Sequence, residues 1–268
     1  MAFSVTLSAE QYDIVWEDLR LGEQPYPIAI RGHGKTMRER ALIRNRVYGE
    51  LTARRLASGP RLEPELEKLL VRLGRPAVWL DMIWLPDREA QVIRNALVAR
   101  SGDDGLLAEL LPEGGLRLTN VRGTAAIHAL LDLLPPNNAA PGHSITLPAE
   151  ALAPVSPGQH RADDPGSILD EAPPARAAAS QQVRALEALF AQPRVRGGQI
   201  GVNCRDHHGR RARGRPLEWF DTTGGRCMAQ FGEGPDGRDH LVIVPADNAR
   251  IAARLHGMID TLTGGGFA

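Results

Sequence analysis

The chain has 268 residues, of which 43% are hydrophobic and 24% charged, and its formal net charge is zero. That length suits one large domain or two small ones, and a neutral chain has no general electrostatic attraction to nucleic acid or an anionic membrane. The first residues lack the basic and apolar parts of a signal peptide, and no apolar stretch reaches the roughly 18 residues of a membrane span. We therefore expect a cytoplasmic protein, not bound to membrane, with Cys204 and Cys227 as free thiols.

Helical patterns dominate the beginning of the chain. Ser8 is placed to cap a first helix, and an extended run follows at 26–30. A second helix is predicted from about 37 to 57. The leucines of 62–73 recur at helical spacing, and Gly74 ends that third helix.

The segment "IAIRGHGKT" before the second helix resembles a phosphate-binding loop, because Lys35 and Thr36 follow a glycine. The first glycine of that motif would stand at position 29, where the chain has Ala29. The same residues also form a T-x-x-E capping box, in which Thr36 and Glu39 exchange hydrogen bonds with each other's backbone amides. We favour this structural cap and keep nucleotide hydrolysis at Lys35 and Thr36 as the alternative.

Strand patterns replace helical ones after residue 76. Turn residues separate the apolar runs, and a helix with Ile127 and Leu134 on one face follows them. The four predicted strands are 77–85, 92–100, 106–111 and 116–120.

A proline-rich connection interrupts this order at 136–179, where only 144–148 looks extended. A helix starting at Ser180 then restores it, and Asp247 is placed to cap a last helix. Between these two helices we predict a polar loop, 205–214, and four strands, 197–204, 215–222, 226–231 and 239–244.

The order helix, four strands, helix therefore occurs twice. We predict an α+β fold with a central antiparallel sheet and helical bundles, built from two pseudo-symmetric halves whose hairpins lie side by side. The expected organisation is a single domain, 1–268, with a first half at 1–135, the connection at 136–179, and a second half at 180–268.

Signs of catalysis or metal binding are weak. Cys204, Asp206, His207 and His208 lie close together in sequence, but adjacent histidines on a strand point apart, and a metal needs three or four convergent ligands. We predict no metal, no cofactor and no enzymatic activity.

An arginine cluster in the predicted polar loop gives a second alternative, a nucleic-acid-binding module. No aromatic side chain interleaves with the cluster, so the usual stacking platform is missing, and we predict no nucleic-acid partner. Its members are Arg210, Arg211, Arg213 and Arg215.

The first predicted strand carries large apolar groups on both of its faces. Helices on both sides of the sheet explain this pattern, and so does a partner protein that covers one face. If a partner binds there, alternation along the strands gives a candidate set on the outward face: Trp79, Asp81, Ile83, Gln199, Asn203 and Phe220. The assignment of Phe220 is less secure, because Leu217 and Trp219 compete with it for the inward face.

Several stretches together resemble a known family. "HGKTMRERALIRNRV" (33–47), with its continuation at 51–81, is similar to a conserved family helix and first strand, and "GLRLTNVRGTAAIHALLDLLP" (115–135) to the end of a first half. "GGQIGVNCRDHHGRR", "WFDTTGGRCMAQF" and "VIVPADNARIAARL" (within 197–255) resemble its second half. The family is that of the EspG chaperones of ESX (type VII) secretion in actinobacteria.

This resemblance implies a cytoplasmic, non-enzymatic protein of two pseudo-symmetric halves. The family binds PE–PPE heterodimers at the apolar tip of the PPE helical hairpin and keeps that tip covered until export. The central sheet and the C-terminal helices form the binding surface. The implied partner here is a PE–PPE heterodimer or a PPE-like or WXG100-type secretion substrate, and a homodimer is left open.

Overall fold

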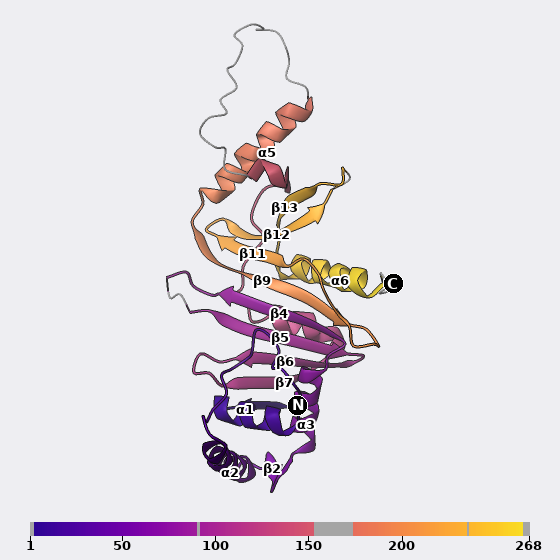
Figure 1. The fold of residues 1–268 in the computed structure, drawn as a ribbon. Coiled ribbons are helices and arrows are strands. Elements are labelled where there is room, and N and C mark those ends of the chain that lie inside the picture. Colours follow the sequence, from indigo (N-terminus) through magenta and orange to yellow (C-terminus); the bar gives the residue numbers. More distant parts are fainter. Residues whose placement is uncertain (1–2, 90–91, 153–173, 235, 265–268) are drawn as a thin grey trace, which may run out of the picture.

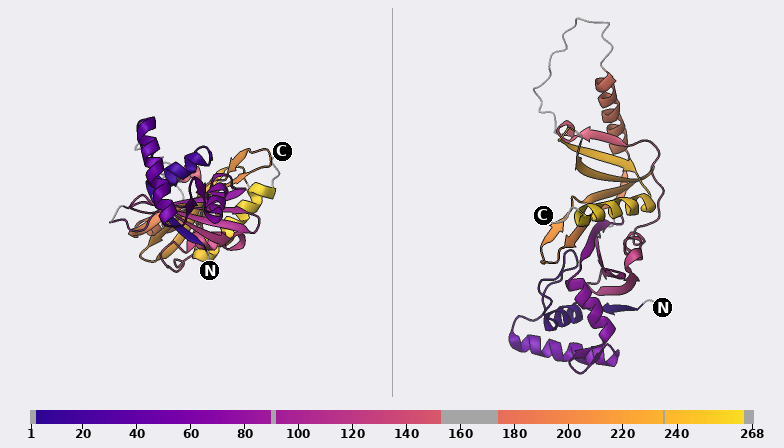
Figure 2. Two further views of the ribbon diagram at one scale, coloured as in Figure 1. Left: turned by 90° about the horizontal axis from the view of Figure 1, so that it is seen from below. Right: turned by 90° about the vertical axis from the view of Figure 1, so that its right-hand side faces the viewer.

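The computed structural model describes residues 3–89, 92–152, 174–234 and 236–264, and it has an α+β fold with an elongated shape (Figures 1 and 2). The helices are α1 (Ala9–Asp18), α2 (Met37–Ala53), α3 (Pro64–Gly74), α4 (Ala126–Leu131), α5 (Pro174–Phe190) and α6 (Asn248–Gly264). The strands are β1 (Ser4–Leu7), β2 (Ala57–Ser58), β3 (Arg61–Leu62), β4 (Val78–Leu85), β5 (Arg94–Ser101), β6 (Asp104–Leu110), β7 (Leu116–Arg122), β8 (Ile145–Pro148), β9 (Arg194–Arg205), β10 (Arg211–Arg213), β11 (Leu217–Thr222), β12 (Gly225–Glu233) and β13 (Asp239–Pro245).

One antiparallel sheet runs the length of the molecule. Its order is β1-β7-β6-β5-β4-β9-β11-β12-β13-β8, and β10 pairs with β9 beside this path. Seen from below, the strands fan out as the sheet twists (Figure 2). The prediction of two hairpin sets side by side in one antiparallel sheet is confirmed.

The two halves meet where β4 pairs with β9, and we call this pair the seam. Trp79 lies opposite Asn203, Asp81 opposite Gly201, and Ile83 opposite Gln199. Each half contributes its first long strand to the seam, and its remaining long strands follow outward in chain order. The seam is therefore the centre of the pseudo-symmetric arrangement.

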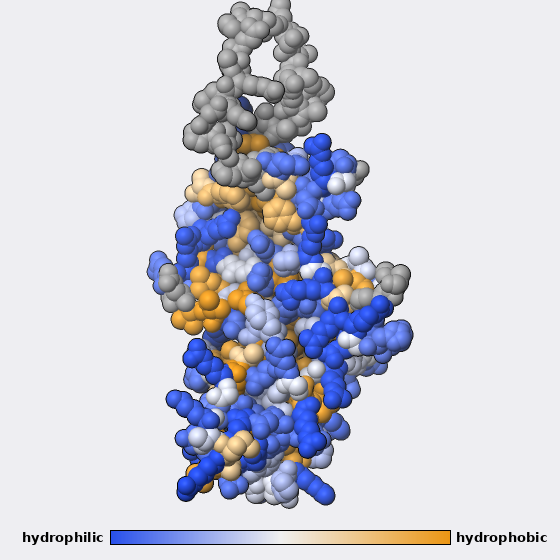
Figure 3. All heavy atoms as spheres, viewed as in Figure 1, coloured by the Kyte–Doolittle hydropathy of each residue, from blue (hydrophilic) through white to orange (hydrophobic). Residues whose placement is uncertain are grey.

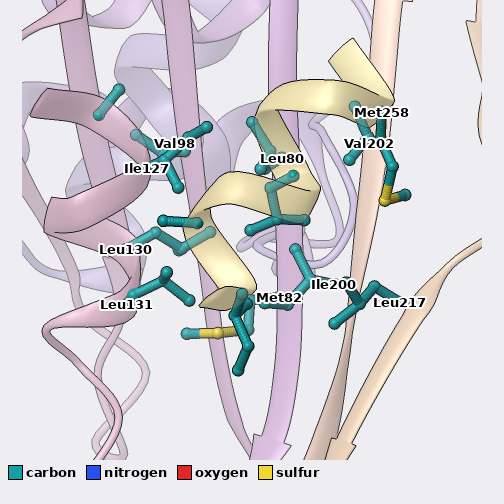
Figure 4. Packing of buried hydrophobic residues seen from close by; sticks show 14 of the residues in the cluster. Leu80, Met82, Val98, Ile127, Leu130, Leu131, Ile200, Val202, Leu217 and Met258 are labelled. Atoms are coloured by element: carbon teal, nitrogen blue, oxygen red, sulfur yellow. The ribbon is translucent and has the colours of Figure 1, made fainter. Parts of the chain in front are cut away.

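One face of the seam is buried by α4 and α6 (Figure 4). The side chains that point to this face alternate along each strand, as the period of two requires. Leu217 and Trp219 belong to it, so they point inward as expected. The core under α4 and α6 includes Leu80, Met82, Val98, Ile127, Leu130, Leu131, Ile200, Val202, Leu217 and Met258.

The opposite face is covered only towards its two ends. At one end α1, α2 and α3 pack with β5, β6 and β7 around a second core. At the other end α5 packs over β11, β12 and β13 around a third, smaller core. The apolar groups on both faces of β4 were explained either by helices on both sides of the sheet or by a partner protein on one side. Helices do cover the two ends of this second face, but its middle carries no helix of the described chain and leaves room for a partner.

The predicted helix caps are present. Ser8 and Gln11 form a capping box at α1, and Thr36 and Glu39 form one at α2. At the start of α6 the Asp247 carboxylate accepts a hydrogen bond of 2.8 Å from the amide of Arg250.

Several boundaries differ from the predictions. Helix α2 ends at Ala53 and not near 57, because Arg55 takes a left-handed conformation with φ of 59° before β2. The residues 26–30 form a turn with a cis Tyr26–Pro27 peptide bond, not a strand. The predicted loop 205–214 contains β10, which folds back on β9.

The proline-rich connection predicted at 136–179 is shorter in the structure. Strand β8 confirms the extended stretch at 144–148 and forms the edge beside β13. Helix α5 begins at Pro174, before the predicted start at Ser180; proline is favoured in a first helical turn, where its missing N–H has no partner to lose. The remainder of the predicted connection, 153–173, lies outside the described residues.

A buried ion pair stabilises the second half. Arg226 has 0% and Asp221 1% of its side chain exposed, and two of their contacts are 2.7 and 2.9 Å. The Arg226 guanidinium also donates to the Asn248 side chain and, at 2.7 Å, to the Pro135 carbonyl. Arg196 lies 3.0 Å from the same aspartate. Arg226 thus joins β11, β12, the start of α6 and the end of the first half.

Both cysteines are free and buried, in different places. Cys204 belongs to the core under α4 and α6, whereas Cys227 belongs to the small core under α5. Within the described ranges, no helix combines the length and the apolar character needed to cross a membrane.

Candidate functional site

The helix-free middle of the sheet is the candidate site, and we call it the open face. It consists of the outward-pointing residues of the seam together with Glu218 of β11. Ile83 and Gln199 are half-buried, Glu218 is exposed, and Asp81 and Asn203 are only 2% and 4% exposed. The residues of the open face are Trp79, Asp81, Ile83, Leu85, Gly197, Gln199, Gly201, Asn203 and Glu218.

One end of the open face is apolar. Ile83, Leu85 and Ile93 line a hollow of 620 Å³ together with the two glycines near the start of β9. The hollow is also lined by the polar side chains of Arg88, Gln199 and Glu218. Ile93 is 64% exposed, and the neighbouring Val195 is 38% exposed. The Arg88 amide donates to the Val195 carbonyl at 3.1 Å, which holds the β4–β5 connection beside the start of β9. Figure 3 shows hydrophobic groups gathered at the left, where β4 ends.

The other end of the open face is polar. Arg213 of β10 forms a two-pronged ion pair with Asp81, with N–O distances of 2.7 and 3.0 Å. Asn203 donates to Asp81 at 2.7 Å and accepts from Arg213 at 3.1 Å. Figure 3 shows hydrophilic groups on this right-hand side, around the β9–β10 hairpin.

Gly201 makes this polar arrangement possible. A Cβ at this position would lie 2.5 Å from Arg213 Nη2 and 2.7 Å from Asp81 Oδ1. The guanidinium therefore lies flat over the backbone of β9, where a side chain of any other residue would stand.

The six residues predicted for partner binding all lie on the face opposite α4 and α6, but they are not equally accessible. Phe220 is 6% exposed within the core under α5, and the Arg194 guanidinium stands 4.6 Å from its ring centre. Trp79 is partly buried against the helices of the first half. Ile83 and Gln199 are the members of the set best placed to meet a partner, and their role stays a prediction.

The site also includes features that the sequence reasoning missed. Arg213 was assigned to a solvated loop, although its aspartate partner stands 132 residues away. The paired glycines Gly197 and Gly198 line the hollow at the apolar end. The close spacing of these glycines and Gly201 in "GGQIG" is the signal that marks a strand approached closely by other groups.

The phosphate-loop alternative meets a physical obstacle at the start of α2. The amides of Lys35 and Thr36 both donate to the Glu39 carboxylate, at 2.8 and 3.1 Å. A bound phosphate would need these donors, so the carboxylate already occupies the anion position. The nearby His33 amide donates to Asp13 at 2.7 Å, which agrees with a structural role for this loop.

We expect Thr36→Ala to lower the free energy of unfolding by about 1 kcal/mol through loss of the cap. Lys35→Ala should leave stability nearly unchanged, because the lysine side chain is exposed. Thermal melts of both variants test this order. ATP binding by the unaltered protein that disappears in Lys35→Ala would reverse it and restore the nucleotide alternative.

The arginine cluster does not form a continuous basic stripe. Arg210 contacts Asp206 at 2.6 Å, and Arg215 contacts Asp239 at 2.7 Å. Arg213 is held by Asp81 as described, so three of the four side chains already face carboxylates. The rings of His207 and His208 are tilted by 46° with their centres 3.8 Å apart, and the described residues contain no group of three or more potential metal ligands.

Comparison with known proteins identifies the family and a similar fold. A model of the EspG family matches residues 8–257. A solved structure that matches is that of the Mycobacterium tuberculosis type VII secretion system chaperone EspG5 in complex with a PE25–PPE41 dimer. The TM-score is 0.67 at 12% sequence identity, and the match covers 97% of this chain and 96% of the other. Curated protein sequences give no significant match.

Proposed function

This chain belongs to the EspG family, and we propose that it is a cytoplasmic chaperone of type VII secretion. The proposed substrate is a PE–PPE heterodimer or a PPE-like helical-hairpin protein, which it binds and keeps soluble for export. The similar fold of a chaperone solved with a PE–PPE dimer supports this substrate class. The role is one of binding and not of catalysis.

The open face is the observation that carries this proposal. Its apolar end leaves Ile83, Leu85 and Ile93 around a hollow that no helix among the described residues fills. An exposed apolar tip of a helical hairpin would be an aggregation liability, and a sheet face of mixed character can cover it. The exposed apolar groups of the chaperone and of its substrate would then shield each other from water.

The direct test is binding of a purified PE–PPE or PPE-like pair from the same genome, beginning with any such pair encoded by a neighbouring gene. Ile83→Ala is expected to weaken binding by more than about 1 kcal/mol, because interfaces concentrate their energy in a few large apolar groups. Trp79→Ala should weaken it similarly, but its packing against the first-half helices makes it the less specific variant. Titration calorimetry and thermal melts measure affinity and folding separately.

Leu42→Ala is the matched control, because Leu42 is an apolar side chain on α2 with 63% exposure, outside the open face. It should bind as the unaltered chain does. Normal binding by a folded Ile83→Ala protein would remove the apolar end from the interface. Failure of the unaltered chain to bind the neighbouring pair would contradict the proposed function itself.

A further inference from the structure

A cleft at the polar end of the open face is lined by three arginines, and only one of them is paired with a carboxylate of the described chain. The cleft measures 490 Å³ and lies between the loop at 23–29, the end of α3, and the strands β4, β9 and β10. Arg205, Arg211 and Arg213 all line it. This volume is large enough to admit side chains of a docked partner.

The charges in this cleft are unbalanced. Arg213 is matched by Asp81, and the other lining carboxylate, Glu23, is exposed at the rim. Within the described part of the chain, neither Arg205 nor Arg211 has a carboxylate at ion-pair distance. The cleft is therefore lined by two arginines without an internal counter-charge, the half-buried Arg205 and the exposed Arg211.

Arg205 lies in an unfavourable environment for its charge and for its hydrogen-bond donors. Its Nε is buried and has no hydrogen-bond partner in the described structure. Burial, with the positive charges of Arg211 and Arg75, lowers the pKa of Arg205 below its ordinary value. A buried donor without a partner costs free energy, and an incoming acceptor would recover that cost.

We propose that this cleft binds a carboxylate side chain of the docked secretion substrate, with Arg205 and Arg211 as its ligands. The inference rests on the proposed function and adds a polar anchor to it, because the cleft continues the open face beyond Asp81. Guanidinium groups bind carboxylates through paired, charge-assisted hydrogen bonds, which gives geometric selectivity as well as attraction. The apolar end takes the hairpin tip, and the arginine cleft fixes its orientation.

A protein carboxylate fits this cleft better than a nucleic acid does. A nucleic-acid backbone needs a continuous basic track, and Arg213 and Arg215 are already tied to Asp81 and Asp239. The chain is also neutral overall. A carboxylate needs only the two arginines that remain without a counter-charge.

The test compares the unaltered chain with Arg205→Gln/Arg211→Gln by titration with the neighbouring PE–PPE or PPE-like pair at several salt concentrations. We expect at least a tenfold loss of affinity at moderate salt and a weaker salt dependence, because the variant has lost the charged contacts. The matched control is Arg38→Gln/Arg61→Gln, which removes two exposed arginines away from the cleft and should change neither quantity. Thermal melts confirm that each variant is folded.

Three outcomes would overturn the inference while leaving the proposed function intact. One is unaltered binding, with unaltered salt dependence, by the folded cleft variant. A second is a thermal shift with inorganic phosphate that the cleft variant loses while its substrate affinity is unchanged, which would assign the cleft to a free anion. A third is binding of a labelled single-stranded oligonucleotide that only the cleft variant loses, again with normal substrate affinity.

Discussion

Asp221→Asn is expected to destabilise the protein by about 3–5 kcal/mol, the range for removing one partner of a buried ion pair. The Arg226 guanidinium is fully buried. It would still donate to the Pro135 carbonyl oxygen and to Asn248 Oδ1, but its charge would lose the Asp221 counter-charge. Asparagine preserves the size of the side chain, so packing changes little. Denaturant unfolding monitored by circular dichroism measures the loss.

The same substitution at the surface provides the control. Asp239→Asn breaks the pair between Arg215 and Asp239, whose side chains are 53% and 50% exposed. Exposed pairs contribute at most about 1 kcal/mol, so this variant should remain close to the unaltered chain. Similar stabilities for the two asparagine variants would contradict the structural role assigned to Arg226.

Gly198→Val is expected to destabilise the protein by about 1–3 kcal/mol or more, the usual cost of overpacking a core. Gly198 lies opposite Trp84 in the seam, and the Trp84 Cα and Cβ lie close to the glycine. A Cβ would stand 2.6 Å from Trp84 Cβ and against the carbonyl oxygen of Ile83. Because backbone atoms form part of the obstacle, a rotation of the tryptophan alone cannot relieve it.

Gly232→Val tests the same change in an open position. Gly232 also belongs to a strand, β12, and a Cβ there would meet no atom within 4 Å. Valine has a higher strand propensity than glycine, so this variant should be as stable as the unaltered chain or slightly more stable. Equal losses of stability in the two valine variants would mean that close packing against Gly198 does not exclude a side chain at this position of the seam.

The sequence predicted the elements that depend on local rules. The capping boxes at Ser8 and Thr36 follow from residues three positions apart, and the long strands from period-two alternation between turn residues. Strand β1 was missed although its alternating burial, with Val5 and Leu7 inward, agrees with its sequence. It is four residues long and runs directly into the Ser8 cap of α1, so the helical pattern dominated this part of the sequence.

The candidate site was less predictable because its contacts are distant in sequence. Alternation placed Trp79, Asp81 and Ile83 correctly on one face, and the antiparallel seam aligned Gln199 and Asn203 with them. Accessibility depends instead on which helices fold over that face, and no local pattern indicates that α5 buries Phe220 or that Arg213 reaches Asp81. The sequence therefore predicted a face but not the part of it that remains open.

The seam also has a consequence for the order of folding. Each half closes its hairpins over short loops. Strand β4 must instead wait for β9, which begins at Arg194, 116 residues after Val78. Pairings of such high contact order form slowly, because loop-closure entropy opposes them. During synthesis the first half therefore emerges from the ribosome with the hydrogen-bonding edge of β4 unpaired. An unpaired edge attracts other strands, so the nascent chain passes through an aggregation-prone stage that ends only when the second half completes the sheet.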